Sequence, residues 1–598
     1  MKPDHAQPRP LSQAQPPVCV LKLGSSVLET DADYQAAAQE VFRHVRRGEK
    51  VIAVVSALAG QTDALLAQGE RVGGNGAEPH PAFLARLARV GELQSAALMG
   101  LALARVGLRT RVMDPDEMGL MAEGEPLDSD LASVDRDALH SALSLNEVLV
   151  VPGFTAQHAK HGVVTLGRGG TDLTAVFFAA EAGAARVRLI KDVDGVYAED
   201  PAQNPDAERY AELDYGKAAE ASKGLIQPKA IWAARDAGVV IEIAAMGAAE
   251  ATRICSAPAR KAPARPQRPL RVALLGCGAV GAGVLAHLKA RPELFELNPV
   301  LVRRPETREG EAGVVFTADL DRALAHRPDL VIEAMGGADY PATIMEGVLA
   351  SGASVVTANK AALARHYDGL HAAARQGGGR LAYSASVGGG TPILEALERL
   401  VRAGGVRRIE GVMNGTANFL LDRLAEGANF DAAVKRAQAL GFAEADPAAD
   451  VDGHDAADKL SLLIREAFAI AVDPADIPKD SLADVSADKV QRAREEGLAY
   501  KQIGLCELLP DGTLKAEVRV RPVPLNHPLA GARNEENRFV ITGSDHAVHA
   551  LFGKGAGRWP TAAAVFADVM DIQRRLSEPE AQSKARKGEP DRPLRLRA

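Results

Sequence analysis

The chain has 598 residues, 47% of them hydrophobic and 25% charged, which is the composition of a soluble globular protein too long for one hydrophobic core. With 70 basic residues, 78 acidic residues and only 4% aromatic residues, it lacks the basic surface and the stacking rings of a general nucleic-acid binder. The four cysteines are separated and form no CxxC pair, which argues for a reducing compartment and against a zinc site. No apolar run is long enough to cross a membrane. We therefore expect a cytoplasmic protein without nucleic-acid or membrane partners.

Polar, proline-bearing segments divide the chain. Residues 1–17 are proline-rich and lack the apolar core of a signal peptide, so we expect a disordered leader. Four prolines in the stretch 256–269 predict a linker, and the charged stretch 577–598 predicts a disordered tail. Two large blocks remain, and in both of them short β-branched runs alternate with helical stretches, which predicts α/β folds.

The first block, residues 18–255, places polar side chains at the ends of predicted strands. "VCVLKLGSSVL" (18–28) has Lys22 near the end of a strand, and "TLGRGGTDLTA" (165–175) sets glycines before a helix. Amides exposed in such a turn can bind phosphates, and an arginine there can clamp a carboxylate. The block contains no Walker A sequence, so it is not a P-loop kinase. The candidate site residues are Lys22, Ser56, Thr62, Arg168, Thr171, Asp172, Asp192 and Asp194.

Together these motifs resemble the amino acid kinase fold, and most closely the aspartokinases. The resemblance implies an α/β sandwich that transfers a phosphoryl group from ATP, with Mg²⁺, to aspartate, a reaction that needs mainly positioning and charge neutralisation. It implies that Lys22 stabilises the transferred charge and that Asp192 and Asp194 lie at the nucleotide. The aspartate-binding residues that it implies are Ser56, Thr62, Glu92, Arg168 and Asp172.

Three departures from the aspartokinases leave an alternative open. The string "KLGSSVL" is one residue tighter than the usual motif and closer to glutamate 5-kinases. The stretch "ASKGLIQPKA" (221–230) lacks the usual lysine at the nucleotide, for which Lys223 or Lys229 could substitute. The paired regulatory (ACT) domains of bifunctional relatives are not recognised. The block is therefore either an active aspartate kinase or a non-catalytic module for regulation or oligomerisation.

The second block opens with a glycine-rich turn between a strand and a helix, "RVALLGCGAVGAGVLAHL" (271–288). In GxGxxG spacing the first glycine permits the tight turn, the second lets a pyrophosphate approach, and the third lets the helix pack on the strand. We therefore predict a Rossmann domain over 270–392, with a purely structural turn as the alternative. The predicted cofactor contacts are Gly276, Gly278, Ala279, Val280 and Gly281.

The next strand, "PVLVRR", ends in Arg303 and Arg304, where an NAD-specific site usually has an acidic residue. Guanidinium groups suit a 2′-phosphate, so we predict NADPH, with NADH and two merely solvated arginines as the alternative. "EAMGG" (333–337) and "TANK" (357–360) end later strands. They bring Lys360 to the carboxyl edge of the sheet, where ligands bind in this architecture.

An acidic stretch, "GFAEADPAADVDGHDAADKL" (441–460), contains a single lysine. Aligning Gly453 with the glycine of an EF-hand puts Ala448 and Lys459 at ligand positions, which argues against a calcium site. The second half predicts a helix with Asp455 and Lys459 on one face. An ammonium caged by carboxylates can protonate an oxygen that gains charge as hydride arrives at a carbonyl. The alternative is an ordinary surface ion pair.

Several motifs of the second block together resemble the homoserine dehydrogenases: "TANK", "SASVGGGTPI" (384–393), "NGTANFLL" (414–421), the acidic stretch, "HPLAG" (527–531) and "FGKGAGRWPTAAAVFADVMDI" (552–572). The resemblance covers nearly all of 270–573. It implies NAD(P)H-dependent interconversion of aspartate 4-semialdehyde and homoserine. It also implies an α+β catalytic and dimerisation domain over 393–576, the last part of which returns to the Rossmann domain.

The family motifs assign roles to single residues. Lys459 matches the catalytic lysine that is the proposed proton donor, and Lys360 matches a lysine that contacts cofactor and substrate. Gly336 and Gly555 match cofactor contacts. Three acids match the substrate site and are implied to hold the amino group of homoserine: Glu444, Asp450 and Asp455, the last also beside the catalytic lysine.

One family feature, a monovalent cation (Na⁺ or K⁺), meets a departure. Many relatives have a glutamate ligand where this chain has Ser384, so only Val387 and Gly389 remain as implied ligands.

The leading hypothesis is a bifunctional enzyme of threonine and methionine biosynthesis that acts on small molecules as a homodimer or homotetramer. The alternatives are a monofunctional homoserine dehydrogenase with a non-catalytic kinase-like module, and a nucleotide-binding regulator without enzymatic activity.

Overall fold

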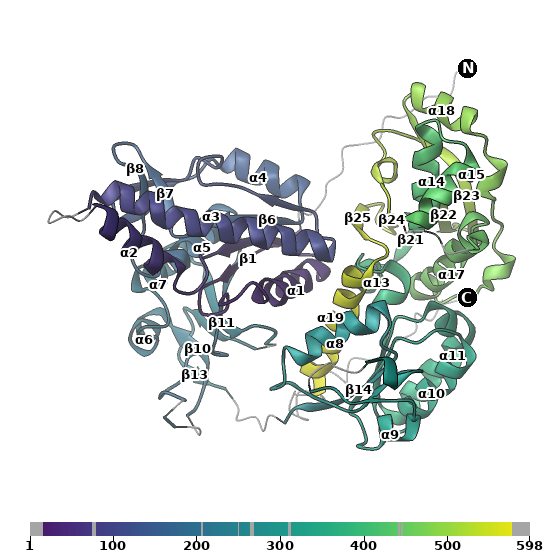
Figure 1. The fold of residues 1–598 in the computed structure, drawn as a ribbon, viewed down its shortest axis with the longest axis horizontal. Helices are drawn as coiled ribbons and strands as arrows, with labels where there is room; N and C mark the ends of the chain where they lie inside the picture. The colour runs from purple at the N-terminus through teal and green to yellow at the C-terminus, as the bar shows by residue number, and fades with distance from the viewer. Residues whose placement is uncertain are drawn as a thin grey trace. The chain divides into compact units, whose positions relative to one another are not determined.

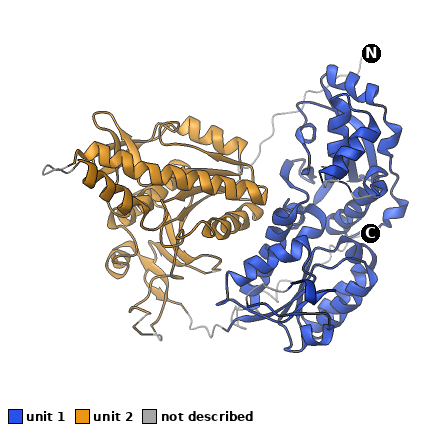
Figure 2. Ribbon diagram, in the orientation of Figure 1, with its two compact units in different colours: residues 1–15, 268–598 blue, residues 16–267 orange. Residues whose placement is uncertain are grey.

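The computed structural model (Figure 1) describes residues 16–73, 79–201, 203–204, 207–248, 250–262, 268–308, 313–440, 443 and 446–576. Two compact units divide the chain: residues 16–267, the first unit, and residues 1–15 with 268–598, the second unit (Figure 2). The expected leader, except residues 16 and 17, and the expected tail lie outside the described residues. No helix in the described part combines the length and the apolarity needed to span a membrane.

A nine-stranded sheet forms the centre of the first unit, in the order β13-β10-β12-β11-β9-β1-β2-β6-β3. Its strands are β1 (Val18–Leu23), β2 (Lys50–Val55), β3 (Thr110–Val112), β6 (Val148–Pro152), β9 (Arg186–Lys191), β10 (Tyr210–Asp214), β11 (Val240–Ala245), β12 (Thr252–Cys255) and β13 (Arg260–Lys261). A smaller sheet, β5-β4-β7-β8, contains β4 (Met121–Glu125), β5 (Asp128–Ser133), β7 (Thr155–His158) and β8 (Gly162–Thr165).

Helices cover both faces of the large sheet, which is why its central parallel strands are continuous apolar runs. One layer contains α1 (Asp33–Arg46) and α3 (Pro81–Val106), with α2 (Gln61–Gly73) packed on α3. The opposite layer contains α5 (Gly170–Glu181), α7 (Pro228–Ala237) and α4 (Arg136–Leu145). A short helix, α6 (Tyr215–Ala221), follows β10.

The predicted linker 256–269 is wrong at residues 260 and 261. Arg260 and Lys261 form the edge strand β13, which pairs antiparallel with β10. Their side chains form ion pairs with Glu212 and Glu208 of the neighbouring segment. Composition suggested a free linker because nothing there is apolar, but an edge strand needs only backbone partners and solvated side chains.

In the second unit, a parallel sheet runs in the order β17-β16-β14-β18-β19-β20, with β15 beside β14. This is the doubly wound order 3-2-1-4-5-6 of a dinucleotide-binding fold. The strands are β14 (Leu270–Leu275), β15 (Phe295–Leu297), β16 (Val300–Leu301), β17 (Phe316–Thr317), β18 (Leu330–Glu333), β19 (Ser354–Thr357) and β20 (Leu381–Ala382). Its helices are α8 (Ala279–Lys289), α9 (Leu320–Leu324), α10 (Asp339–Ala350) and α11 (Lys360–Gly377), and the last helix, α19 (Arg558–Leu576), packs on α8.

The rest of the second unit is an antiparallel sheet, β23-β22-β21-β24-β25, packed with helices. Its strands are β21 (Val406–Val412), β22 (Leu498–Leu508), β23 (Leu514–Pro524), β24 (Glu536–Gly543) and β25 (Val548–Lys554). The helices are α12 (Ser384–Gly388), α13 (Ile393–Ala403), α14 (Gly415–Ala425), α15 (Phe430–Ala439), α16 (Ala448–Val451), α17 (His454–Phe468) and α18 (Ala487–Glu495). Helix α17 contacts α11, α13 and β22, so it lies between the two sheets of this unit.

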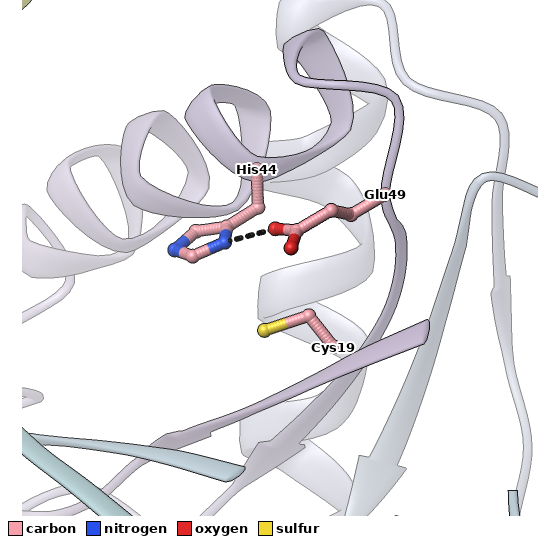
Figure 3. A group of neighbouring side chains, drawn as sticks. All are labelled: Cys19, His44 and Glu49. Atoms are coloured by element: carbon pink, nitrogen blue, oxygen red, sulfur yellow. Dashed lines mark hydrogen bonds and ion pairs between the residues drawn. The ribbon is translucent and has the colours of Figure 1, made fainter. Parts of the chain in front are cut away.

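A buried polar cluster lies between α1 and β1 of the first unit (Figure 3). The Nδ1 atom of His44 lies 2.6 Å from Oε2 of Glu49, and its Nε2 atom lies 3.6 Å from Oε1 of Glu40. Burial alone would lower the pKa of His44, but its contacts with Cys19, Glu40 and Glu49 outweigh burial and raise that pKa to about 9. His44 is therefore an imidazolium cation at neutral pH.

Three atoms of this cluster, the Cys19 sulfur, a His44 nitrogen and a Glu49 oxygen, lie within 4.8 Å of one another, a spacing that could also hold a metal ion. The surrounding charges argue against a metal, because Arg186 pairs with Glu49, while Arg43 and Arg188 lie at Glu40. Guanidinium groups and an imidazolium already neutralise both carboxylates, so the cluster is a structural ion network.

Replacing this imidazolium gives a pH-dependent stability test. Because the pKa of His44 is raised from 6.5 to about 9, its stabilising effect is complete below pH 6.5 and disappears as pH rises through 9. His44→Gln should lower the free energy of unfolding by on the order of a few kcal/mol at pH 6, and by much less near pH 10. Calorimetric unfolding of the full chain measures this, with the exposed His140→Gln as the matched control. A pH-independent loss would show that His44 contributes by packing alone.

Candidate active sites

One carboxylate holds two lysines together in the second unit. Asp455 and Lys459 lie one turn apart on α17, and the Nζ atom of Lys459 donates to Oδ2 of Asp455 at 2.8 Å. The same Nζ donates to the backbone oxygen of Met413, which follows β21, at 2.7 Å. Lys360, the first residue of α11, forms an ion pair with Oδ1 of Asp455. Residues from three segments thus meet at the carboxyl edge of the parallel sheet.

The ionisation states follow from burial and charge. The side chains of Asp455 and Lys459 are only 15% and 14% exposed. Burial would raise the pKa of Asp455, but the ammonium groups of Lys459 and Lys360 hold it well below its usual range. Burial would likewise lower the pKa of Lys360, yet Asp455 raises it. Asp455 is therefore a carboxylate and Lys360 an ammonium throughout the physiological range.

An asparagine that the sequence analysis did not assign joins this group. Nδ2 of Asn414 donates to Oδ1 of Asp450 at 2.6 Å and to Oδ2 of Asp455 at 2.8 Å. The other atom of its carboxamide, Oδ1, accepts from the backbone of Ala417 and caps α14, which fixes the direction of the side chain. Asn414 thereby links Asp450 to Asp455, whereas Glu444 lies outside the described residues.

A second unassigned residue, Glu333, connects the two loops at the end of β18 and β19. It is fully buried, and it accepts from the Thr357 hydroxyl and from the backbone of Met335 at 2.7 Å. The amide of Asn359 donates to Glu333 and to the backbone of Gly337. Burial raises the pKa of Glu333 in spite of these bonds. This network fixes the backbone that leads into Lys360.

The glycine-rich turn has the close contacts that its spacing predicts. Gly276 has φ of +97°, and a Cβ atom there would lie 2.5 Å from the backbone oxygen of Ala334. A Cβ atom on Gly281 would lie 2.2 Å from the oxygen of Gly276, so the helix packs directly on the turn. Gly278 caps α8, and space is open beside it and beside Gly336. Helix α8 begins with Ala279 and Val280 beside the open space at Gly278, and backbone amides at a helix N-terminus suit a pyrophosphate.

The two arginines predicted at the ribose lie one step beyond the strand. Strand β16 ends at Leu301, so Arg303 and Arg304 belong to the following turn, where both are exposed. The predicted strand end is wrong because β16 pairs with its neighbours over only two residues. A third residue, Arg308, donates to the backbone oxygen of Cys277 inside the glycine-rich turn. Three guanidinium groups therefore lie along the turn that follows β16.

The first unit repeats the motif of one carboxylate between two lysines. Nζ of Lys22 on β1 lies 3.0 Å from Oδ1 of Asp172, and Nζ of Lys191 on β9 lies 3.1 Å from Oδ2. All three side chains are buried. Burial and the positive charge of Lys22 lower the pKa of Lys191. Lys191 directly precedes the predicted Asp192 but was not assigned, although its position at the end of a strand was an available signal.

Some of the other predicted residues of the first unit contact this cluster, and others are exposed. Ser56 donates to the Thr171 hydroxyl at 3.0 Å, beside Asp172. Glu92 of α3 is buried, and burial raises its pKa to about 8 although the Ala57 backbone and Lys22 act in the opposite direction. Thr62 is half-buried, Arg168 and Asp192 are exposed, and Asp194 accepts from Tyr197 and lies 3.7 Å from Arg209.

Of the two lysines considered as substitutes at the nucleotide, Lys223 is exposed. Lys229 is paired with Asp128 and Asp130 of β5 at 2.9 and 3.0 Å. Lys229 is therefore held by the smaller sheet.

Comparison with known proteins decides the family. Residues 392–570 match the family model described as homoserine dehydrogenase, and residues 276–384 match its NAD-binding domain. A homoserine dehydrogenase of Corynebacterium glutamicum is 35% identical over 337 residues, which cover 53% of this chain and 75% of the relative. The chain belongs to the homoserine dehydrogenase family.

A second relative agrees with this assignment. A homoserine dehydrogenase of Synechocystis sp. is 35% identical over 317 residues, covering 51% of this chain and 73% of the relative. The crystal structure of a homoserine dehydrogenase from Thiobacillus denitrificans is 31% identical, covers 52% of this chain and 75% of its own, and superposes with a TM-score of 0.49. Residues 17–245 match the amino acid kinase family, so the domains together have the arrangement of a bifunctional aspartokinase/homoserine dehydrogenase.

The segment around Ser384 is the one in which many members of the family bind a monovalent cation. The backbone N–H and the hydroxyl of Ser384 both donate to the buried carboxylate of Asp568 on α19, at 3.0 and 2.9 Å. Ser384 therefore brings no charge of its own to a cation. Gly389 has φ of +61° and approaches Gly555 so closely that a Cβ atom would lie 2.4 Å from the Gly555 oxygen, while Val387 is buried.

A substitution at the glycine-rich turn tests the dinucleotide site. In Gly276→Ala the new methyl group would meet the Ala334 oxygen at 2.5 Å in a left-handed backbone conformation. The strain should weaken nicotinamide dinucleotide binding about tenfold or more, measured by fluorescence titration of the full chain. Gly347→Ala is the matched control, because space is open around that helical glycine. Unchanged affinity with unchanged thermal stability would contradict the assignment.

Proposed function

We propose that this chain is a bifunctional enzyme. The second unit reduces L-aspartate 4-semialdehyde to L-homoserine with NADPH, and the first unit phosphorylates L-aspartate with ATP and Mg²⁺. One observation supports the reductase activity most. The Asp455 carboxylate holds the ammonium groups of Lys459 and Lys360 at the carboxyl edge of the parallel sheet, the edge at which the glycine-rich turn also lies. The two activities would act on small molecules of threonine and methionine biosynthesis.

Lys459 is the proposed proton donor. An ammonium has three N–H groups, and two of those on Lys459 are directed at Met413 and Asp455. The third remains for the carbonyl oxygen of the substrate. When bound, NADPH supplies the hydride that reduces the aldehyde carbon. Lys459 then gives its proton to the oxygen that becomes the hydroxyl of homoserine, and it takes up a new proton from solvent.

The acids around this lysine would select the substrate. Asp450 is held toward the site by Asn414, and its remaining oxygen can accept from the α-ammonium group of the semialdehyde. We propose that Glu444 shares this role. Lys360, which carries its positive charge at the sheet edge, would contact both cofactor and substrate.

The turn after β16 favours NADPH over NADH in this proposal. Arg303 and Arg304 are exposed there, and Arg308 is attached to the glycine-rich turn. Guanidinium groups in that position suit a ribose 2′-phosphate, and no acidic residue lies at the end of β16. For the monovalent cation we propose backbone oxygens of Val387 and Gly389 without a carboxylate at 384, because Ser384 is bonded to Asp568.

Removing the proposed proton donor tests the reductase activity. Lys459→Ala should lower kcat for NADPH oxidation with aspartate 4-semialdehyde by about 10²- to 10⁴-fold, the usual range for a general acid. Dinucleotide binding should change little. Lys435→Ala, an exposed lysine on α15, is the matched control. If the Lys459→Ala protein kept a tenth or more of its kcat, another group would have to be the donor.

Charge arrangement supports the kinase activity of the first unit. Phosphoryl transfer requires cations that neutralise the transferred group, and Lys22 and Lys191 lie side by side on adjacent strands. Asp172 keeps both ammonium groups in place. We propose that Asp192 and Asp194 lie at the nucleotide and its Mg²⁺, and that Ser56, Thr62, Glu92 and Arg168 bind aspartate.

An assay for aspartyl phosphate separates this proposal from a non-catalytic module. The full chain should form aspartyl hydroxamate with ATP, aspartate and hydroxylamine. Arg168→Ala should reduce that activity at least about tenfold by removing the clamp on the aspartate carboxylate. The exposed Arg105→Ala serves as the control. Absence of hydroxamate formation in the unmodified chain, with the reductase intact, would favour the alternative of a regulatory or oligomerisation module.

A further inference from the structure

A pocket of about 290 Å³ lies in the first unit between helices α5 and α7 and strand β5. The two helices pack against each other in one layer (Figure 1). Two charged residues, Asp130 and Lys229, line the pocket together with a larger apolar set. That set consists of Leu131, Leu173, Val176, Phe177, Ala180, Ala233 and Ala237. Mostly apolar walls with a few charged groups are typical of sites that bind small molecules.

The apolar walls of the pocket are not all closed off from water. Leu173 and Val176 are buried and form its floor, whereas Phe177, Ala180 and Ala233 are half-buried and pack against the core from outside. Apolar surface that stays in contact with water is unfavourable, and its burial by a ligand is favourable in proportion to the area covered. The walls therefore suit a ligand with an apolar part.

One charge of each sign lines the pocket. The Nζ atom of Lys229 lies 2.9 Å from Oδ1 of Asp128 and 3.0 Å from Oδ1 of Asp130. The hydrogen bond with Asp128, and next that with Asp130, raise the pKa of Lys229 and outweigh its burial, so Lys229 is an ammonium cation. Two carboxylates share this one cation, which leaves one negative charge in excess.

Both charges keep capacity for a ligand. An ammonium has three N–H groups, and two of those on Lys229 face the aspartates, so the third remains for another acceptor. Oδ2 of Asp130 accepts from no residue in the described part of the chain. A ligand carboxylate would complement Lys229, and a ligand ammonium would complement the excess negative charge at Asp130.

These features define the chemical class of the ligand. It carries a carboxylate and an ammonium close together, because Lys229 and Asp130 are themselves in contact, and it carries an apolar chain behind them. A pocket of this size is at the lower end of the range of ligand sites, about 300 to 1,000 Å³, so it takes one small molecule. An amino acid with an apolar side chain meets all three requirements.

We propose that this pocket binds a free amino acid with an apolar side chain. Its α-carboxylate pairs with Lys229 and its α-ammonium with Asp130, while the side chain lies on Leu173 and Val176. The proposal goes beyond the function proposed above and does not depend on it, since a first unit without kinase activity would bind the same ligand.

The location gives such a ligand access to the kinase-like cluster. Leu173, on the pocket floor, directly follows Asp172, the carboxylate of that cluster. Asp128 lies against the glycine-rich turn, because a Cβ atom on Gly167 would meet its Oδ1 at 2.4 Å. A ligand in the pocket would therefore contact the helix that carries Asp172 and the strand that borders this turn.

Titration calorimetry of the full chain with L-leucine, L-isoleucine and L-phenylalanine tests the proposal. At least one of the three should bind at millimolar concentration or below. Ala233→Phe fills the pocket and should weaken that binding at least about tenfold. Ala221→Phe, at an exposed residue at the end of α6, is the matched control and should leave the affinity unchanged. Thermal unfolding of both variants reports whether they are folded.

A second variant and truncated ligands test the two charges. Lys229→Met should weaken binding about tenfold by removing the partner of the carboxylate, and exposed Lys223→Met should not. Analogues that lack one charged group should also bind at least about tenfold more weakly; for leucine these are 4-methylpentanoate and 3-methylbutylamine. Lys229→Met and these analogues keep the proposal testable if Ala233→Phe disturbs folding.

Three results would each overturn the proposal. The first is that none of the three amino acids binds. The second is an affinity that Lys229→Met and a folded Ala233→Phe variant leave unchanged, which would place the bound amino acid elsewhere on the chain. The third is an analogue with only one charged group that binds as tightly as the amino acid, which would show that the ligand is not a zwitterion.

Discussion

A carboxylate shared between two ammonium groups is the interaction on which the second unit's site depends. Lys360 and Lys459 come from α11 and α17, and without Asp455 between them their charges would repel. Asn414, at the start of α14, binds the same carboxylate. One anionic side chain thus gathers residues from the parallel and the antiparallel parts of the unit, and the cations that it gathers keep it ionised.

The first unit also has a carboxylate between two lysines, but the proposed reaction there is different. Asp172 lies between Lys22 and Lys191, and all three are buried. In the proposed kinase the positive charge would face a phosphoryl group; in the reductase it would face one oxygen. In both cases a protein stabilises concentrated positive charge before the substrate arrives by placing a carboxylate inside it.

Sequence patterns predicted the parts of this protein that depend on local spacing. The GxGxxG turn and the helix bearing Asp455 and Lys459 both follow from residue intervals. The contacts of Asn414, Glu333 and Lys191 did not, because each depends on segments that meet only through tertiary packing.

Two segments were mispredicted for physical reasons that composition does not show. Residues 260 and 261 form an edge strand because backbone pairing with β10 needs no apolar side chain. Strand β16 stops at Leu301 because its neighbours end there, although Val302 and the arginines that follow would suit a longer strand.

Helix α17 has a consequence for how a reductase of this shape would work. Its buried residues, among them Ala457, Leu460 and Leu463, belong to one continuous core that also contains Ala273 of β14 and Phe539 of β24. The two lobes of the second unit therefore share their interior and are not free to hinge apart as rigid shells. In such a reductase, admission of substrate and expulsion of water would rely on small rearrangements of loops, so that turnover would not require the hydrophobic interior to be remade.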